Sequence, residues 1–109
     1  MIENLVGNQT SERVLLYIVN YGEGHTSGIA QTFDIPKSQV RKQLIRLENG
    51  GILIGRNVAN TRMFQLNPRC PYRKELEGLL EKVLSLIPDV EKEKYYRQRR
   101  RPRRTGKSL

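Results

Sequence analysis

Apolar residues recur at helical intervals in the first third of the chain. A helix is predicted over residues 11–21, where four apolar residues share one side: Val14, Leu15, Ile18 and Val19. A glycine-rich stretch ends this helix. Thr26 or Ser27 is then expected to cap a short second helix that runs through Thr32, because a hydroxyl oxygen accepts a hydrogen bond from an otherwise unpaired backbone N–H.

A third helix is predicted over residues 37–49. Pro36 suits its start because the fixed φ of proline matches a helix, and Gly50 can adopt a positive φ and end it. Wound at about 100° per residue, the segment places apolar residues on one face and polar residues on the other. The apolar set is Val40, Leu44 and Leu47, and the polar set is Ser38, Gln39, Lys42 and Arg46. The first face predicts a buried anchor, and the second a surface free to contact a ligand.

The second half of the chain predicts a hairpin followed by a long helix. Residues rich in β-branched side chains flank Ala59 and Asn60 and favour two strands within residues 52–68. A helix over residues 71–87 has a wide apolar stripe made of Tyr72, Leu76, Leu79, Leu80, Val83, Leu84 and Ile87. A short helix capped by Asp89 is predicted to follow. The predicted class is mainly α with a small β-hairpin, in the order helix, helix, helix, strand, strand, helix.

Basic charge is concentrated at the C-terminal end. The formal net charge is +9 at pH 7; residues 1–90 hold 11 Lys or Arg and 9 Asp or Glu, and residues 91–109 hold 9 and 2. We therefore predict one domain over residues 1–90 and a basic, Arg-rich tail over residues 91–109. Such a surplus favours an anionic partner, with nucleic acid first and membrane lipid second.

Composition argues against a membrane or secreted protein. No stretch approaches the roughly 20 consecutive apolar residues needed to cross a bilayer. The N-terminal stretch carries an acid rather than the basic residues of a signal peptide. Cys70 is the single cysteine and cannot form an internal disulfide, which fits a reducing cytoplasm. A soluble cytoplasmic protein without a membrane partner is expected.

Few residues suit catalysis or metal binding. His25 and Cys70 are the only histidine and cysteine, whereas zinc sites normally gather four ligands. One histidine leaves few candidates for a general base, and serines and acids do not cluster around it. The terminal "TGKSL" lacks the first glycine of a phosphate-binding loop. A non-enzyme without a metal or other cofactor is predicted.

The polar face of the third helix carries side chains that suit DNA recognition. Gln39 can form two hydrogen bonds with adenine, and Arg41, Lys42 or Arg46 can reach guanine or phosphate. Lys37 lies at the helix N-terminus, where the helix dipole favours phosphate. An ordinary solvated helix can have the same composition. It is the order of the elements that favours DNA binding by this helix.

Residues 9–87 resemble the winged helix-turn-helix regulators of the ArsR and MarR type found in bacteria and archaea. The resemblance lies in "SERVLLYIVNYGEG", in "SGIAQTFDIPKSQVRKQLIRLENGGIL" and in the wing "GRNVANTRMFQLNP". Many relatives have Gly at the turn where this chain has Asp34, a residue that tolerates left-handed backbone. The resemblance implies a transcriptional regulator that binds double-stranded DNA in a sequence-specific manner. The implied contacts are Lys37, Ser38, Gln39, Arg41, Lys42 and Arg46 in the major groove, and Arg56, Asn60 and Arg62 of the wing near the minor groove or backbone.

The resemblance also implies a homodimer. A core of about 80 residues is modest, and the long helix after the wing has more apolar surface than such a body easily covers. The predicted dimer interface is Leu15, Ile18, Tyr72, Leu76, Leu79, Leu80, Val83 and Leu84. The alternative is that this stripe closes the core of its own domain.

The tail is predicted to strengthen DNA binding with little choice of sequence. Its arginines can lie along phosphates or in a minor groove: Arg97, Arg99, Arg100, Arg101, Arg103 and Arg104. Contact with RNA or membrane, or a role in solubility alone, are the alternatives. For the whole chain the alternative function is an adaptor, because similar winged helices also accompany small nucleotidyltransferase domains, where they dock a protein or RNA.

Overall fold

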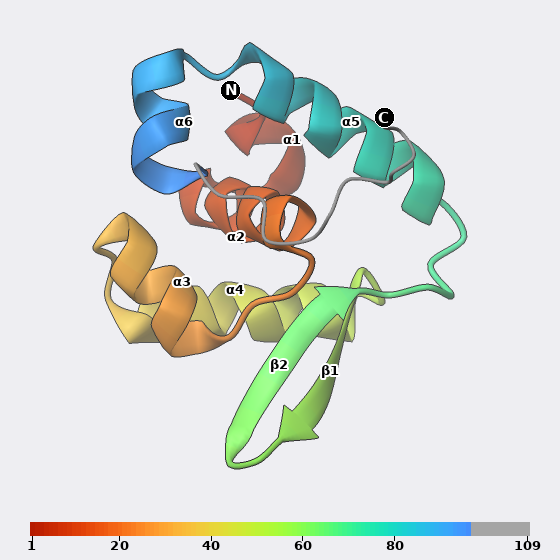
Figure 1. The fold of residues 1–109 in the computed structure, drawn as a ribbon. Helices are drawn as coiled ribbons and strands as arrows, with labels where there is room; N and C mark the ends of the chain where they lie inside the picture. The colour runs from red at the N-terminus through yellow and green to blue at the C-terminus, as the bar shows by residue number, and fades with distance from the viewer. Residues whose placement is uncertain (97–109) are drawn as a thin grey trace, which may run out of the picture.

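Six helices and one antiparallel hairpin make up the part of the chain that the computed structural model describes, residues 1–96 (Figure 1). The predicted class, mainly α with a small hairpin, is confirmed, and the short α1 is an element that the sequence pattern did not indicate. No helix within residues 1–96 has the length and apolar character needed to cross a bilayer. In chain order the elements are α1 (Glu3–Val6), α2 (Gln9–Tyr21), α3 (Thr26–Phe33), α4 (Lys37–Asn49), β1 (Leu53–Val58), β2 (Thr61–Leu66), α5 (Arg73–Leu86) and α6 (Asp89–Tyr95).

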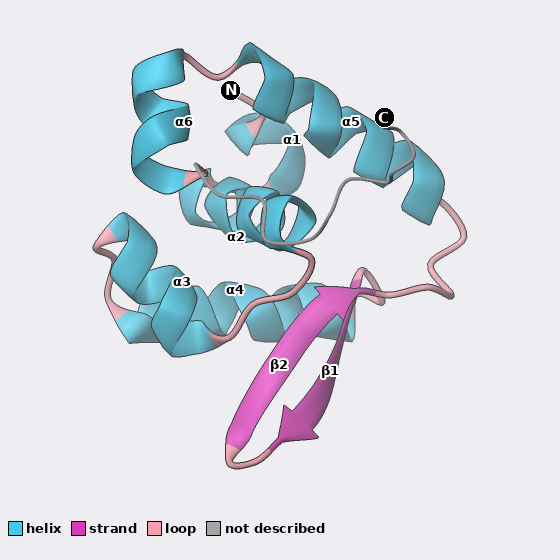
Figure 2. Ribbon diagram, viewed as in Figure 1, coloured by secondary structure: helices cyan, strands magenta, loops and turns pink. Residues whose placement is uncertain are grey.

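Helix α2 lies at the centre of the fold. The pair α3 and α4 lies on one side of it, α5 lies on the other, and the hairpin projects beyond α4 (Figures 1 and 2). Val14, Leu15 and Ile18 of α2 are at most 1% exposed, because both sides of this helix are covered. Leu44 from α4 and Leu80 from α5 pack into the same core and are fully buried. The core therefore fixes α4 relative to the rest of the molecule.

The hairpin is joined to the helical body by a short bridge. Its two strands turn at Ala59, which has a φ of 57°. Phe64 of β2 exchanges two backbone hydrogen bonds, of 2.8 and 2.9 Å, with Gly24 in the segment between α2 and α3. A Cβ at Gly24 would lie 2.8 Å from the ring of Tyr17, so glycine at this position leaves room for that ring. The bridge holds the base of the wing next to the helix-turn-helix.

Two helix starts differ from the sequence prediction. Helix α2 begins two residues early because the side chain of Asn8 caps it, accepting a 2.7 Å hydrogen bond from the N–H of Ser11. Thr26 and Ser27 do not cap α3. His25 occupies the cap position with extended backbone and without a side-chain hydrogen bond to the helix. In both cases several adjacent polar residues could occupy the cap position, and the spacing of the apolar residues does not show which of them does.

Two further boundaries are displaced by one residue. The positive φ that ends α4 is at Gly51, at 79°, whereas Gly50 has a φ of −82°. The N–H of Ile52 donates to the carbonyl of Leu47 and that of Gly51 to the carbonyl of Glu48, a hydrogen-bond pattern that requires the left-handed residue at Gly51. At α6 the cap is Pro88, and Asp89 lies within the first turn rather than at the predicted cap.

Candidate nucleic-acid interface

Helices α3 and α4 form a helix-turn-helix in which α4 is anchored by its apolar face. Val40 and Leu44 are 0% exposed and Leu47 is 3% exposed, which confirms the predicted anchor. Asp34 ends α3 in left-handed backbone with a φ of 56°. Asp34 thus adopts the conformation for which the turn otherwise uses glycine. The buried anchor leaves the opposite face of α4 open to solvent.

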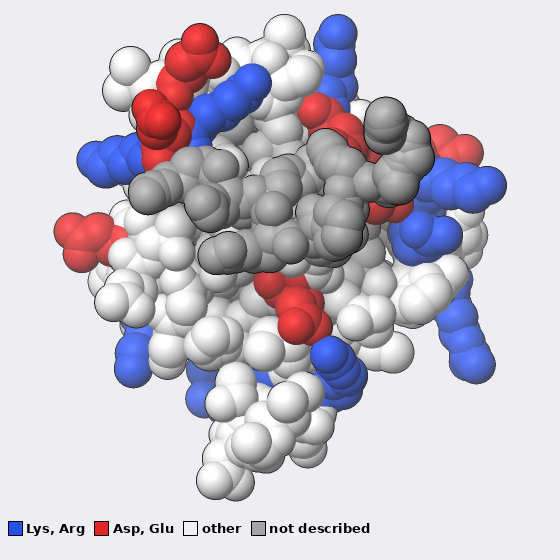
Figure 3. All heavy atoms as spheres, viewed as in Figure 1, with Lys and Arg blue, Asp and Glu red and all other residues white. Residues whose placement is uncertain are grey.

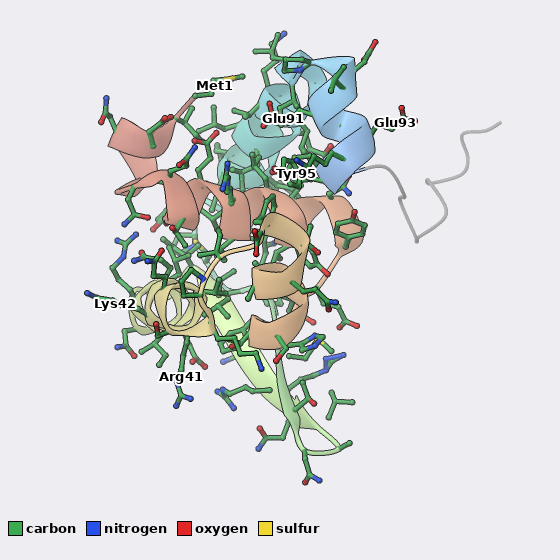
Figure 4. All side chains as sticks on the ribbon, turned by 90° about the vertical axis from the view of Figure 1, so that its left-hand side faces the viewer. Met1, Arg41, Lys42, Glu91, Glu93 and Tyr95 are labelled. Atoms are coloured by element: carbon green, nitrogen blue, oxygen red, sulfur yellow. The ribbon has the colours of Figure 1, made fainter. Side chains whose placement is uncertain are left out.

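The first half of α4 presents five exposed polar side chains: Lys37, Ser38, Gln39, Arg41 and Lys42. None of these side chains forms a hydrogen bond or ion pair within residues 1–96. Figure 4 shows Arg41 and Lys42 projecting outward from the helix. The predicted reading face is therefore accessible and has donors and acceptors available for a ligand.

Ile45 adds an apolar residue to this face that the sequence analysis missed. It is 40% exposed and lies seven residues, close to two helical turns, after Ser38. The same spacing rule that identified the buried face would have placed Ile45 beside Ser38 and Lys42. An aliphatic side chain at such a position can contact the methyl group of thymine.

Arg46, which the sequence predicts as a DNA contact, forms its hydrogen bonds within the chain. Its Nη2 donates 2.9 Å hydrogen bonds to the carbonyl of Val6 and to Oγ of Ser11, and its Nε donates a 2.9 Å bond to Oε1 of Gln43. The side chain therefore turns toward α1 and α2 instead of outward with Lys42. Sequence spacing missed this because the partners lie 35 and 40 residues away.

Of the three wing residues predicted to contact DNA, two form ion pairs within the chain and one is exposed. Arg56 forms a 2.9 Å ion pair with Glu23, and Arg62 a 2.6 Å ion pair with Glu48 of α4. Both arginines remain about half exposed, at 52% and 46% of their side chains, so the pairs are weak in water. Asn60 is exposed at the turn of the hairpin. The two arginines can exchange a carboxylate for a phosphate at little cost.

The charge on the described surface is uneven. Helix α4 carries four Lys or Arg and one acid, Glu48, which is paired with the wing. In Figure 3 acidic and basic side chains are mixed over α5 and α6 in the upper part, whereas mainly Lys and Arg side chains flank the wing in the lower part. A polyanion would therefore be attracted to the side of the molecule formed by α4 and the wing.

Most of the predicted dimer interface lies inside the single chain. Helix α2 packs against α5. Leu15 and Ile18 of α2 are 1% exposed, and Leu80, Val83 and Leu84 of α5 are at most 8% exposed. Leu76 is partly buried against the same core. In this arrangement these six residues close the core of their own domain, as in the alternative considered for the stripe. Their apolar pattern was recognised, but periodicity does not show which surface covers a helix.

A narrower apolar stripe remains exposed on α5. Tyr72 at the helix cap is 48% exposed, Leu79 36% and Leu86 56%. They are seven residues apart and so lie almost in line along one side of the helix. Val90 of α6 is 82% exposed near the end of this stripe. Tyr72 and Leu79 are the members of the predicted interface that are accessible to a partner, and the structure adds Leu86, which the prediction did not include.

An aromatic cluster fixes the end of α6 to the helix-turn-helix. The ring of Phe33 in α3 lies 5.0 Å from that of Tyr95 and 5.8 Å from that of Tyr96. The guanidinium of Arg13 lies 5.4 Å from the Phe33 ring centre, and the hydroxyl of Tyr21 donates a 2.7 Å hydrogen bond to the carbonyl of Tyr95. Burial raises the pKa of Tyr96 above its ordinary value. Residues 91–95 of the predicted tail therefore lie in α6, and Tyr96, which precedes the first arginine of the tail, is fixed beside α3.

Metal-binding chemistry finds little support among the described residues. No group of three or more His, Cys, Asp or Glu within residues 1–96 is arranged to hold a metal ion. His25 lies at the start of α3, and Cys70 is buried after the wing.

The predicted tail contacts, the six arginines from Arg97 to Arg104, lie outside the described residues.

Comparison with solved structures identifies the fold. The chain is similar to the antimony-specific transcriptional repressor AntR, with 23% identity, a TM-score of 0.62, and coverage of 84% of this chain and 78% of AntR. It is also similar to a variant of ZitR from Lactococcus lactis, with 22% identity, a TM-score of 0.55, and coverage of 79% and 66%. A scan against protein-family models finds no match, and neither does a search of curated proteins. These likenesses confirm the winged helix-turn-helix fold.

Proposed function

We propose that the protein is a dimeric, sequence-specific DNA-binding regulator of transcription. The observation that carries this proposal is the exposed face of α4, on which Lys37, Gln39, Arg41 and Lys42 stand opposite the buried anchor. A helix held in this way can enter a major groove and direct its first turns at base edges. The similarity of the fold to transcriptional repressors supports the same reading.

The contacts divide between bases and phosphates. Gln39 suits adenine, Arg41 or Lys42 suits guanine, and Ile45 suits a thymine methyl group. Ser38 and Lys37 lie at the helix start, where phosphate is favoured by the dipole. The wing would follow the backbone or minor groove through its three polar residues: Arg56, Asn60 and Arg62. Arg46 is left out of this set because Nε and Nη2 of its guanidinium are engaged within the chain.

The proposed dimer uses the Tyr72–Leu79–Leu86 stripe. A two-fold axis beside α5 would bring the stripes of two chains together and present two α4 helices to one duplex. Large apolar side chains in a row on the exposed side of a helix favour a protein contact over solvent. The proposed interface thus keeps Tyr72 and Leu79 from the wider set inferred from the sequence and adds Leu86.

The Arg-rich tail would extend the same interface. Its arginines begin at Arg97, directly after Tyr96, which the aromatic cluster holds beside α3. The eight residues 97–104, which hold all six arginines, can span about 26 Å when extended, most of one turn of B-DNA. Its six arginines can therefore reach phosphates beyond the site read by α4, adding affinity with little sequence choice.

Replacing Gln39 and Lys42 with alanine tests base recognition by α4. We expect the double variant to lose about 1 to 3 kcal/mol per lost base contact on its preferred duplex and much less on random duplexes. Titration of labelled duplexes at fixed salt measures the affinity for the preferred duplex and for random duplexes. Lys74→Ala on α5 is the matched control, because it removes an exposed charge on another helix, away from the Tyr72–Leu79–Leu86 stripe, and should leave both affinities unchanged. An equal loss on every duplex would exclude base recognition by these two residues.

A further inference from the structure

A hydrogen-bond network around Arg46 joins the recognition helix to the N-terminal segment. The guanidinium contacts three acceptors from three places in the fold: the last carbonyl of α1 at Val6, the hydroxyl of Ser11 in α2, and the amide oxygen of Gln43 in α4. All three distances are 2.9 Å, within the range of well-formed hydrogen bonds. A single side chain thus links three helices.

The surroundings of the guanidinium are shaped to receive it. Ser11 is 0% exposed and Gln43 is 8% exposed, so both partners are polar groups inside the protein that need a hydrogen bond. Gly7 ends α1 with a φ of 117°, and a Cβ at this position would lie 2.8 Å from Nη2 of Arg46. Asn8 next to it caps α2 on the N–H of Ser11. Val6, Gly7 and Ser11, at the junction between α1 and α2, thus all border this one group.

Arg46 is well placed to control how α4 is oriented. It lies one turn beyond Lys42 and next to Ile45, two side chains of the outward face. A rotation of α4 about its axis would move these side chains and the Arg46 guanidinium together. Because the guanidinium is fixed at both α1 and α2, such a rotation would break the network at several points. The network therefore restrains rotation of the helix more than apolar packing alone.

We propose that Arg46 is a positioning residue through which the N-terminal segment sets the orientation of the recognition helix, rather than a residue that contacts DNA. This inference rests on the proposed function, since it concerns the face that would read DNA. The forked guanidinium is essential because a lysine ammonium keeps the charge but cannot reproduce the separate Nε and Nη2 contacts. A phosphate ligand, in contrast, would tolerate lysine well.

Two variants test the network from opposite ends. Arg46→Lys keeps the charge and removes the fork, and Gly7→Ala displaces the guanidinium from a site on α1. Without DNA, we expect amide hydrogen exchange in residues 37–46 to become at least about threefold faster in both variants. Arg41→Lys is the matched control, because Arg41 is exposed on the same helix and forms no hydrogen bond or ion pair within residues 1–96. Wild-type exchange in both test variants would overturn the proposal.

DNA binding gives a second readout. On the preferred duplex both variants should bind about tenfold more weakly, equivalent to one lost base contact, while the slope of log affinity against log salt stays within about 0.3 of wild type. The double variant should lose no more than either single variant, because both remove the same network. Wild-type affinity for Arg46→Lys, together with a slope reduced by about 0.9 in Arg46→Ala, would make Arg46 a phosphate ligand and overturn the proposal.

The two readouts separate this inference from the proposed function. If the wild-type chain selects no DNA sequence but exchange in α4 still responds to Gly7→Ala, the coupling stands and the proposed function fails. Thermal unfolding, monitored by circular dichroism, identifies a variant that has lost its fold. Arg46→Lys retains most of the packing of the arginine stem, so it remains informative if Gly7→Ala is too strained to fold.

Discussion

Leu80→Arg is expected to unfold the protein, whereas Leu79→Arg is expected to leave a folded monomer. Leu80 is 0% exposed between α5 and the core, and an unpaired charge at such a site costs several kcal/mol. The whole free energy of unfolding of a small domain is only about 5 to 15 kcal/mol. Leu79 is 36% exposed in the Tyr72–Leu79–Leu86 stripe, so its arginine can reach water in a single chain but not in an apolar dimer contact.

Circular dichroism and light scattering at micromolar concentration distinguish these outcomes. Glu81→Arg is the control, because Glu81 is exposed on the side of α5 away from the stripe and its replacement should change neither fold nor mass. A monomeric wild-type chain with an unchanged Leu79→Arg variant would remove the stripe as an interface. A cooperatively folded Leu80→Arg chain would contradict the burial of that residue.

Deletion of residues 97–109 is expected to flatten the salt dependence of DNA binding. Each phosphate neutralised contributes about 0.9 to the slope of log affinity against log salt, so a tail that engages three or four phosphates contributes about 3 per chain and about twice that per dimer. The deletion leaves Tyr95 and Tyr96 in the aromatic cluster, so the fold should be retained. The ratio of affinities for preferred and random duplexes should barely change, because phosphate contacts carry no sequence information.

The controls for this deletion change the side chains of the tail and keep its length. With glutamine in place of its six arginines, the tail should behave like the deletion, and with lysine it should retain most of the slope. Salt titrations of the full chain and the three variants on both duplexes provide the measurement. An unchanged slope after deletion would leave the tail without a role in DNA binding.

The sequence predicted the main elements because their patterns are long and local. Val40, Leu44 and Leu47 recur over two turns, and only a buried helix face accounts for that spacing. The wing was found from β-branched residues around Ala59 and Asn60. In each case the information lies within about 15 residues, where periodicity is sufficient. These features fixed the fold class and the outward face of α4.

The features that the sequence did not predict depend on contacts between distant segments. Arg46 has the same charge as Lys42 and lies one turn after it on the same face of α4. Only the position of Val6 and Ser11 shows that Arg46 is engaged within the chain. Leu80 and Leu79 are adjacent and identical, yet one is buried and the other is partly exposed. The short α1 carries too few residues for a periodic signal. Tertiary packing decides each of these cases.

Selection of bound fragments from random duplex DNA tests the central claim most directly. The folded full-length chain is incubated with the random pool, and the bound fraction is amplified and sequenced over several rounds. We predict enrichment of a short sequence in two inverted halves, with centres about one helical turn or 34 to 36 Å apart, and loss of that enrichment in the Gln39 and Lys42 double alanine variant. Failure of the folded wild-type chain to enrich any sequence would contradict sequence-specific DNA binding and favour the adaptor that docks a protein or RNA.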